Sequence, residues 1–111
     1  MKKPKRIQNK SLIKELGRTS RCTVCFAIPV DIDHIRSMGA GGHDVLENLM
    51  PLCRADHTER HKIGLTQFTK KYWRAKAFLE SHGWEFDEAS QKWKHALNWG
   101  SGISDEGDGC T

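Results

Sequence analysis

The sequence predicts a small α+β domain, in which two short strands precede a helix that carries potential metal ligands. Three observations support this fold class. The chain has 111 residues, of which 37% are hydrophobic, and this suits one domain with a limited core. An alternating run, a glycine-rich stretch and a second apolar run lie within residues 28–53. From residue 54 onward the apolar spacing becomes helical.

The N-terminal segment is strongly basic. Residues 1–21 carry eight lysines and arginines against a single acid. We expect residues 1–10 to form a flexible basic arm, because this charged run offers little apolar surface to bury. Ser11 is expected to cap a short helix over residues 12–16, which Gly17 ends.

Two short strands are expected on either side of a loop. Residues 28–35 alternate in polarity and are typical of a strand. One predicted face holds Val30, Ile32 and His34, and the other holds Asp31, Asp33 and Ile35. The three glycines of residues 38–44 indicate a loop. Residues 48–53 form the second predicted strand, which Pro51 confines to a sheet edge because proline has no N–H to donate.

Helices and a hairpin complete the domain. One helix is expected from Arg54 to Gly64, and a second over residues 66–82 with Gly83 as its C-cap. The stripe of the second helix consists of Phe68, Tyr72, Ala75 and Leu79, with Trp73 and Phe78 beside it. The aromatic residues expected in the core are Phe68, Tyr72, Trp84, Phe86 and Trp93.

The C-terminal part is predicted to hold a β-hairpin followed by an unstructured end. Residues 84–87 and 92–95 are separated by a polar turn and are expected to pair. We therefore expect a single domain over residues 11–99 and a disordered acidic tail over residues 100–111.

The cysteines favour metal binding over disulfides. No apolar run is long enough for a membrane span or a signal peptide, so we expect a soluble cytoplasmic protein. Thiols stay reduced in the cytoplasm. Cys22 and Cys25 have Cys-x-x-Cys spacing, Cys53 stands alone and Cys110 lies in the tail.

Two basic blocks indicate nucleic-acid binding. The net charge is +4, and residues 60–76 contain six lysines and arginines without an acid. Such blocks neutralise phosphates and release counterions, although a solvated charged face is the alternative. The candidate contacts are Lys2, Lys3, Lys5, Arg6, Arg36, Arg54, Lys62, Lys70, Lys71 and Arg74.

Residue types that suit metal-assisted hydrolysis occur in a fixed order. Asp33 and His34 end the first predicted strand, and Asn48 opens the second. His57 and His61 are four residues apart and share a helix face. A carboxylate and an imidazole can hold one divalent cation, while a second imidazole stays free as a general base. This arrangement suits hydrolysis of a phosphodiester.

The pattern resembles that of the HNH, or ββα-metal, endonucleases, especially the small phage and prophage members. The resemblance covers about residues 20–68. It rests on Cys22-Thr-Val-Cys25, Asp31-Ile-Asp33-His34-Ile35, Gly41-Gly42, Asn48-Leu49-Met50-Pro51-Leu52-Cys53 and Asp56-His57-x-x-x-His61. It implies one ββα-metal unit with a zinc-knuckle-like cysteine cluster, on which a C-terminal helix and hairpin pack.

The resemblance also implies roles for individual residues. His34 would be the general base, Asp33 and His57 would bind the catalytic metal, and His61 would be a third ligand. Asn48 would hydrogen-bond the backbone of the loop that orients His34. The implied cofactor is one divalent cation, either Mg²⁺, Mn²⁺, Ni²⁺ or Zn²⁺.

The cysteine cluster departs from the family pattern at one position. Many relatives hold a structural zinc with a second Cys-x-x-Cys or Cys-x-x-His, whereas Asp56 stands at the fourth position here. Cys22, Cys25 and Cys53 can bind zinc with Asp56 or with water. Without zinc, the three thiols would serve as small buried apolar groups.

The expected function is metal-dependent hydrolysis of DNA, with nicking favoured by a single metal site. The expected partner is double-stranded DNA, the expected state is a monomer or weak homodimer, and the expected location is the cytoplasm of a bacterial host or phage-infected cell. A junction-resolving or RNA-directed HNH nuclease is one alternative. A non-catalytic zinc-knuckle module that binds nucleic acid is another, although such a module has no need of Asp33, His34 and His57 together.

Overall fold

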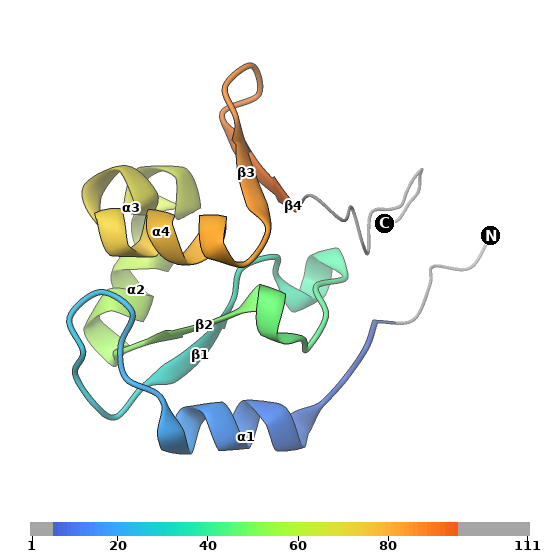
Figure 1. Ribbon diagram of the computed structural model, residues 1–111, viewed down its shortest axis with the longest axis vertical. Coiled ribbons are helices and arrows are strands. Elements are labelled where there is room, and N and C mark those ends of the chain that lie inside the picture. The colour runs from blue at the N-terminus through green and yellow to red at the C-terminus, as the bar shows by residue number, and fades with distance from the viewer. Residues whose placement is uncertain (1–5, 96–111) are drawn as a thin grey trace.

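The computed structural model describes residues 6–95 and confirms the α+β class (Figure 1). The elements in chain order are α1 Lys10–Thr19, β1 Asp31–His34, η1 Met38–Ala40, η2 Leu46–Asn48, β2 Leu49–Leu52, α2 Arg54–Ile63, α3 Leu65–Lys71, α4 Trp73–Ser81, β3 Trp84–Asp87 and β4 Lys92–His95. The strands form two separate two-stranded sheets, β1–β2 and β3–β4. Figure 1 shows α1 below the β1–β2 pair and helices α3 and α4 above it.

The β1–β2 pair and α2 form the ββα unit that the sequence predicts. The two strands are antiparallel, with Asp33 opposite Met50. β1 is shorter than the predicted strand over residues 28–35, because residues 28–29 form a bend and pairing starts only at Asp31. Between the strands, η1 lies in the predicted loop over residues 38–44 and η2 follows that loop. Asn48 ends η2 and does not open the second strand as predicted, because β2 starts at Leu49.

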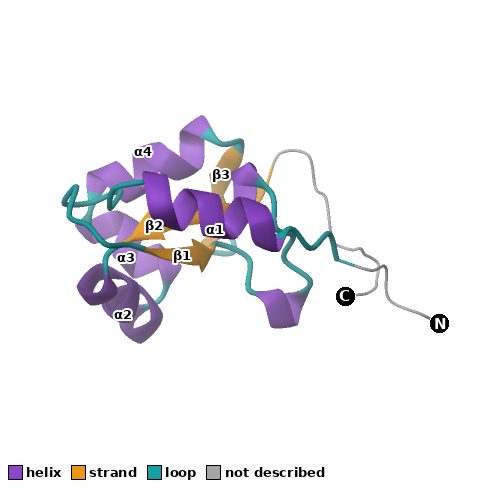
Figure 2. Ribbon diagram, turned by 90° about the horizontal axis from the view of Figure 1, so that it is seen from below, coloured by secondary structure: helices purple, strands orange, loops and turns teal. Residues whose placement is uncertain are grey.

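Helix α1 differs from its predicted form at both ends. Asn9 caps the helix in place of Ser11, because the Asn9 Oδ1 accepts the N–H of Leu12 at 3.0 Å. The helix also continues through Gly17 to Thr19. A glycine inside a helix costs only about 1 kcal/mol relative to alanine, and α1 packs on β1 and β2 along its length (Figure 2).

The helix predicted over residues 66–82 is two helices, α3 and α4. Tyr72 separates them with extended backbone angles, φ −120° and ψ 105°. The break allows the Tyr72 hydroxyl to donate to Glu59 Oε1 of α2 at 2.6 Å. Upstream, Gly64 ends α2 as predicted, with φ at +87°. The C-cap of α4 is His82 and not the predicted Gly83, which follows it in the left-handed region with φ at +91°.

The hairpin has its predicted bounds, and the core lies between β1–β2 and helices α3 and α4. The buried hydrophobic residues are Cys22, Ile35, Leu49, Met50, Leu52, Phe68, Ala75, Leu79 and Trp84. Among the predicted core aromatics, Phe68 and Trp84 are buried, whereas Tyr72, Phe86 and Trp93 are only partly buried. The Trp84 Nε1–H donates to the carbonyl of Glu47 at 2.6 Å, which ties β3 to the segment before β2.

The structure tests only part of the predictions for the two ends of the chain. Residues 1–5 of the predicted arm and the predicted tail over residues 100–111 lie outside the described residues. Residues 6–9 lie along the loop after β1, where Arg6 Nε donates to the Gly42 carbonyl at 2.8 Å. None of the helices in residues 6–95 is long and apolar enough to cross a membrane.

Candidate metal centre and catalytic residues

The ββα unit brings three predicted metal ligands together. Asp33 lies on β1 and is fully buried, while His57 and His61 lie one turn apart on α2. The Nε2 atoms of His57 and His61 lie 3.3 Å and 3.1 Å from Asp33 Oδ1. The two Nε2 atoms are 3.1 Å from each other. Three potential ligand atoms therefore face one point from two elements.

This triangle fits a divalent cation. Ligand atoms held by one cation at about 2.0–2.2 Å lie about 3 to 3.6 Å apart in tetrahedral or octahedral geometry, and the observed separations fall in this range. Neither carboxylate oxygen of Asp33 accepts a hydrogen bond from any described residue, although both are buried. A buried carboxylate requires positive charge nearby, and a bound cation supplies it.

Arg60 lies on the inner side of this centre. Its Nε is 3.1 Å from Asp33 Oδ2, close enough for an ion pair but not aligned for a hydrogen bond. Its Nη2 donates to the carbonyl of Ile35 at 2.9 Å, just beyond β1. The guanidinium therefore compensates one carboxylate oxygen and leaves Oδ1 to the histidines. Arg60 was not predicted at this site, although it follows His57 by three residues and so shares its helix face.

Asp31 orients the His57 ring. Its Oδ2 lies 3.2 Å from His57 Nδ1 and 2.9 Å from Arg54 Nε. A carboxylate only accepts, so the Nδ1 of His57 carries the proton and Nε2 presents its lone pair to the centre. Strand alternation, which puts Asp31 on the same face as Asp33, could have identified this contact.

His34 lies beside the ligand triangle rather than in it. Neighbouring residues of a strand face opposite sides, so the imidazole turns away from the Asp33 carboxylate. Its Nε2 lies 2.7 Å from Asp44 Oδ1, and its side chain is 13% exposed. The structure thus keeps one imidazole apart from the three potential metal ligands that the described residues bring together.

Asn48 joins the two sides of the loop that follows His34. Its Oδ1 accepts the N–H of Arg36 at 2.7 Å, and its Nδ2 donates to the carbonyls of Arg36 and His43 at 3.1 Å and 2.9 Å. The Asn48 side chain is fully buried. A Cβ atom at Gly42 would lie 1.8 Å from the Arg36 carbonyl oxygen, so only glycine fits there. The loop is therefore closely packed around the Asn48 amide.

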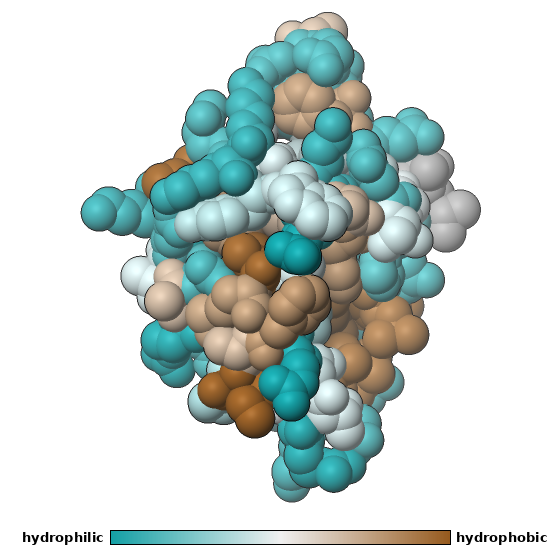
Figure 3. All heavy atoms as spheres, turned by 60° about the vertical axis from the view of Figure 1, so that its left-hand side comes forward, coloured by the Kyte–Doolittle hydropathy of each residue, from teal (hydrophilic) through white to brown (hydrophobic). Residues whose placement is uncertain are grey.

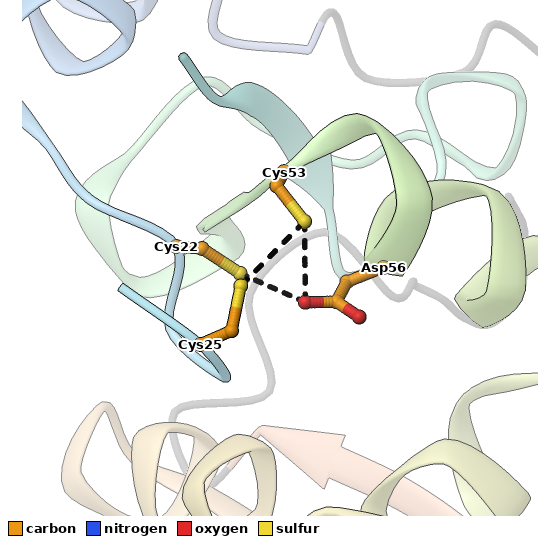
Figure 4. Close-up of side chains that lie close together, drawn as sticks. All are labelled: Cys22, Cys25, Cys53 and Asp56. Atoms are coloured by element: carbon orange, nitrogen blue, oxygen red, sulfur yellow. Dashed lines mark hydrogen bonds between the residues drawn. The ribbon is translucent and has the colours of Figure 1, made fainter. Parts of the chain in front are cut away.

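The three predicted cysteines and Asp56 form a second cluster (Figure 4). Their potential ligand atoms all lie within 4.8 Å of one another. Cys25 Sγ and Cys53 Sγ are 3.8 Å apart, and thiolates on a tetrahedral zinc with bonds of about 2.3 Å lie about 3.8 Å apart. Asp56 Oδ2 lies 3.1 Å from Cys22 Sγ and 3.3 Å from Cys53 Sγ. The four side chains fit a structural zinc with Asp56 as the fourth ligand.

The exposure and pKa values of the thiols bear on the alternative without zinc. Only Cys22 is buried, Cys53 is intermediate and Cys25 is exposed, so the interpretation as three buried apolar groups is wrong for Cys25. Burial, together with the hydrogen bond from the thiol to Asp56, raises the pKa of Cys53 to about 12. Burial also raises the pKa of Cys22. The metal-free thiols of Cys22 and Cys53 are therefore neutral donors to Asp56, and zinc would convert them to thiolates.

A family comparison matches this geometry. The family described as HNH endonuclease has a model that matches residues 20–62, the segment with the cysteine cluster, both strands and α2. The chain contains an HNH domain. Comparison with curated proteins and with solved structures yields no significant match. The predicted family is confirmed, and HNH domains bind a divalent metal, in agreement with the two ligand clusters.

The basic residues around the HNH domain differ in their surroundings. Lys2, Lys3 and Lys5 lie outside the described residues. Three of them form ion pairs with acids: Arg6 with Asp44, Arg54 with Asp31, and Lys71 with Glu59. Arg36 donates a hydrogen bond to the Ala40 carbonyl, and Lys70 donates one to Gln91 Oε1. Lys62 is exposed on α2.

Arg74 lies between two exposed aromatic rings at the edge of the HNH domain. Its guanidinium carbon is 5.0 Å from the centre of the Phe26 ring and 4.7 Å from that of Trp73. These side chains are 54% and 68% exposed. Figure 3 brings the left-hand side of Figure 1 forward and shows apolar side chains gathered among polar ones on this face. Arg74 therefore joins the segment after the Cys-x-x-Cys motif to the start of α4.

Proposed function

We propose that the protein is a metal-dependent endonuclease that hydrolyses DNA phosphodiester bonds. The observation that carries the proposal is the pairing of a cation-binding triangle with a separate imidazole. Asp33 and His34 are adjacent on β1, and they would supply a metal ligand and a proton acceptor on opposite sides of the same strand end. The HNH match over residues 20–62 supports this combination.

Asp33, His57 and His61 would hold one divalent cation, either Mg²⁺, Mn²⁺, Ni²⁺ or Zn²⁺. When bound, such a cation supplies positive charge that stabilises the leaving 3′ oxygen. Arg60 keeps the Asp33 carboxylate in place, and Asp31 keeps the Nε2 of His57 directed at the centre.

His34 would take the proton from the attacking water. An imidazole is the usual proton acceptor for water near neutral pH. Asn48 supports this role indirectly, because it holds the loop that carries Asp44, the hydrogen-bond partner of His34. With a single Asp/His cluster in residues 6–95, one chain would cut one strand at a time and nick a duplex.

Cleavage of supercoiled plasmid tests the proposal. The protein is incubated with Mg²⁺, Mn²⁺, Ni²⁺ or Zn²⁺, and nicked plasmid is expected before linear plasmid. His34→Ala should slow cleavage by about 10² to 10⁴, while fold and metal affinity persist. His82→Gln is the matched control, because His82 contacts Phe78 in α4, away from the centre. Wild-type protein that cuts with none of the cations, or a folded His34→Ala variant that keeps over about a tenth of the rate, would overturn the proposal.

The cysteine cluster favours a second candidate, a non-catalytic zinc-knuckle module that binds nucleic acid. This candidate predicts retention of DNA without cleavage under every cation. The substrate class within the nuclease proposal is tested separately with duplex DNA, a four-way junction and RNA. Faster cutting of the junction or the RNA would favour a junction-resolving or RNA-directed nuclease.

A further inference from the structure

A buried carboxylate, Asp44, lies behind His34 on the loop between β1 and β2. Asp44 is 3% exposed, and its Oδ1 is 2.7 Å from His34 Nε2. It belongs neither to the Asp33 triangle nor to the cysteine cluster. Asp44 follows His34 by ten residues, and the segment between them contains η1, so this contact closes the loop on the imidazole.

We propose that Asp44 is a positioning residue that fixes the orientation and tautomer of His34. The inference rests on the proposed function, in which His34 accepts a proton from water. A carboxylate only accepts hydrogen bonds, so the Nε2 of His34 must donate to Asp44. The lone pair of the neutral ring is then at Nδ1. Asp44 thereby selects Nδ1 as the proton-accepting atom.

The N-terminal segment holds Asp44 from the other side. Arg6 Nη2 lies 2.5 Å from Asp44 Oδ1, and the N–H of Asn9 donates to Oδ2 at 2.8 Å. The N–H of Asp44 in turn donates to the carbonyl of Ile7 at 2.9 Å. Three donors, from Arg6, Asn9 and His34, thus converge on one side chain. Its position does not depend on the imidazole alone.

These donors also keep Asp44 charged. Burial raises the pKa of Asp44, but the Asn9 N–H, the His34 hydrogen bond and the Arg6 charge together lower it below its usual value. A charged carboxylate stabilises the imidazolium that forms when His34 takes a proton. An asparagine at this position has one neutral acceptor oxygen for three donors, and its amide can donate to Nε2 and impose the other tautomer.

Steady-state kinetics of a double-mutant cycle tests the inference. Asp44→Asn should lower kcat by about 10² to 10⁴ and leave KM unchanged. In the His34→Ala background the same change should have no further effect, because Asp44 acts through His34. Glu47→Gln removes a carboxylate from the same loop and is the matched control. An equal loss of kcat in both backgrounds would show a purely structural role and overturn the inference.

A second measurement does not require cleavage. Long-range ¹H–¹⁵N NMR should show the Nε2–H tautomer for neutral His34 in the wild type and its loss in Asp44→Asn, with Mn²⁺ affinity unchanged by calorimetry. A wild-type Nδ1–H tautomer would overturn the inference. If this spectrum is as expected but no cation supports cleavage, the proposed function fails and the Asp44 contact stands.

A second variant covers the case in which Asp44→Asn does not fold. Arg6→Gln keeps Asp44 but removes one of its three donors. It should lower kcat by up to about tenfold, and this loss should disappear in the His34→Ala background. A loss of the same size in both backgrounds would again contradict a role through His34.

Discussion

Asp33 combines burial, charge and two nearby imidazoles at a single position. Arg60 compensates its Oδ2, whereas Oδ1 faces His57 and His61. Removing a ligand from such a centre should therefore change metal affinity more than fold, because Arg60 still bridges β1 and α2 through the Ile35 carbonyl. The three ligands are separable by mutation for this reason.

Metal affinity should fall in each ligand variant. Asp33→Ala and His57→Ala should each weaken Mn²⁺ binding by at least about tenfold in calorimetry, because each removes one ligand atom of the triangle. His61→Ala should behave in the same way, since its Nε2 lies as close to Asp33 as that of His57. His34→Ala is the control and should bind Mn²⁺ like the wild type. Unchanged affinity in Asp33→Ala and His57→Ala would show that the ligands are wrongly assigned.

The free energy of unfolding should depend on pH through the Asp44 carboxylate. Its pKa in the folded protein lies below the ordinary value of 3.8, because the gains from its donors exceed the cost of burial. Its contribution to the free energy of unfolding is therefore complete above about pH 4 and is lost as the pH falls through the folded pKa. The Tm difference between wild type and Asp44→Asn should be largest near pH 6 and shrink below about pH 4. A difference that stays constant from pH 6 to pH 3 would contradict this linkage.

The sequence predicted the residues of both ligand clusters and the contact of Asn48 with the loop backbone, but not the contacts of Asp44. The four-residue helix repeat places His57 beside His61, and the resemblance to the HNH family implied that Asp33 joins them as a metal ligand. Asp44 could not be placed, because it lies in irregular backbone ten residues after His34 and no periodicity relates the two. Its partner Arg6 is still further away in the sequence and was predicted only as a nucleic-acid contact.

Among the elements, the start of α2 has two functions at once. Cys53 caps the helix and Asp56 lies in its first turn, so the proposed zinc would attach the Cys22–Cys25 turn to α2. His57 follows immediately and belongs to the other group of potential metal ligands, with Asp33 and His61. The two ligand clusters are therefore linked through adjacent residues of α2, Asp56 and His57.

Purified protein should contain about one tightly held zinc per chain, and Asp56→Cys should bind it more tightly. Zinc prefers a fourth thiolate to a carboxylate in structural sites. Cys22→Ser should lower the Tm substantially, because metal-binding energy is largely folding energy in a small domain. Metal analysis after mild chelation and thermal unfolding check both expectations. Zinc-free protein that unfolds cooperatively and cuts DNA would contradict them.

The helix break at Tyr72 shows why element boundaries were harder to predict than element types. The apolar stripe continues from Phe68 to Leu79 without interruption, and periodicity alone therefore favours one helix. The break depends on a partner in another helix, because Tyr72 turns toward Glu59 of α2. At α1, the choice of Asn9 over Ser11 as the cap likewise depends on contacts of residues 6–9 with the loop after β1.

At the scale of the described molecule, residues 6–95, positive charge is only partly available to a nucleic acid. Arg6, Arg54 and Lys71 are already paired with carboxylates. The hydrogen bonds from Lys71 and then Tyr72 lower the pKa of Glu59, so this acid stays charged beside Lys71. Lys62 is exposed on α2, the helix that carries His57 and His61. The net charge of +4 therefore does not measure the charge that faces a phosphate.

Two lysine variants of equal net charge should separate these contributions. Lys62→Gln should weaken binding to duplex DNA and reduce the slope of log K against log salt by about 1, because one phosphate contact and its released counterion are lost. Lys71→Gln should change the affinity and the salt slope less, since Glu59 already neutralises the Lys71 ammonium. Fluorescence anisotropy at several salt concentrations, in the His34→Ala background to prevent cleavage, measures both slopes. Equal slopes for the two variants would mean that DNA responds to overall charge, and that α2 does not contact the phosphates through Lys62.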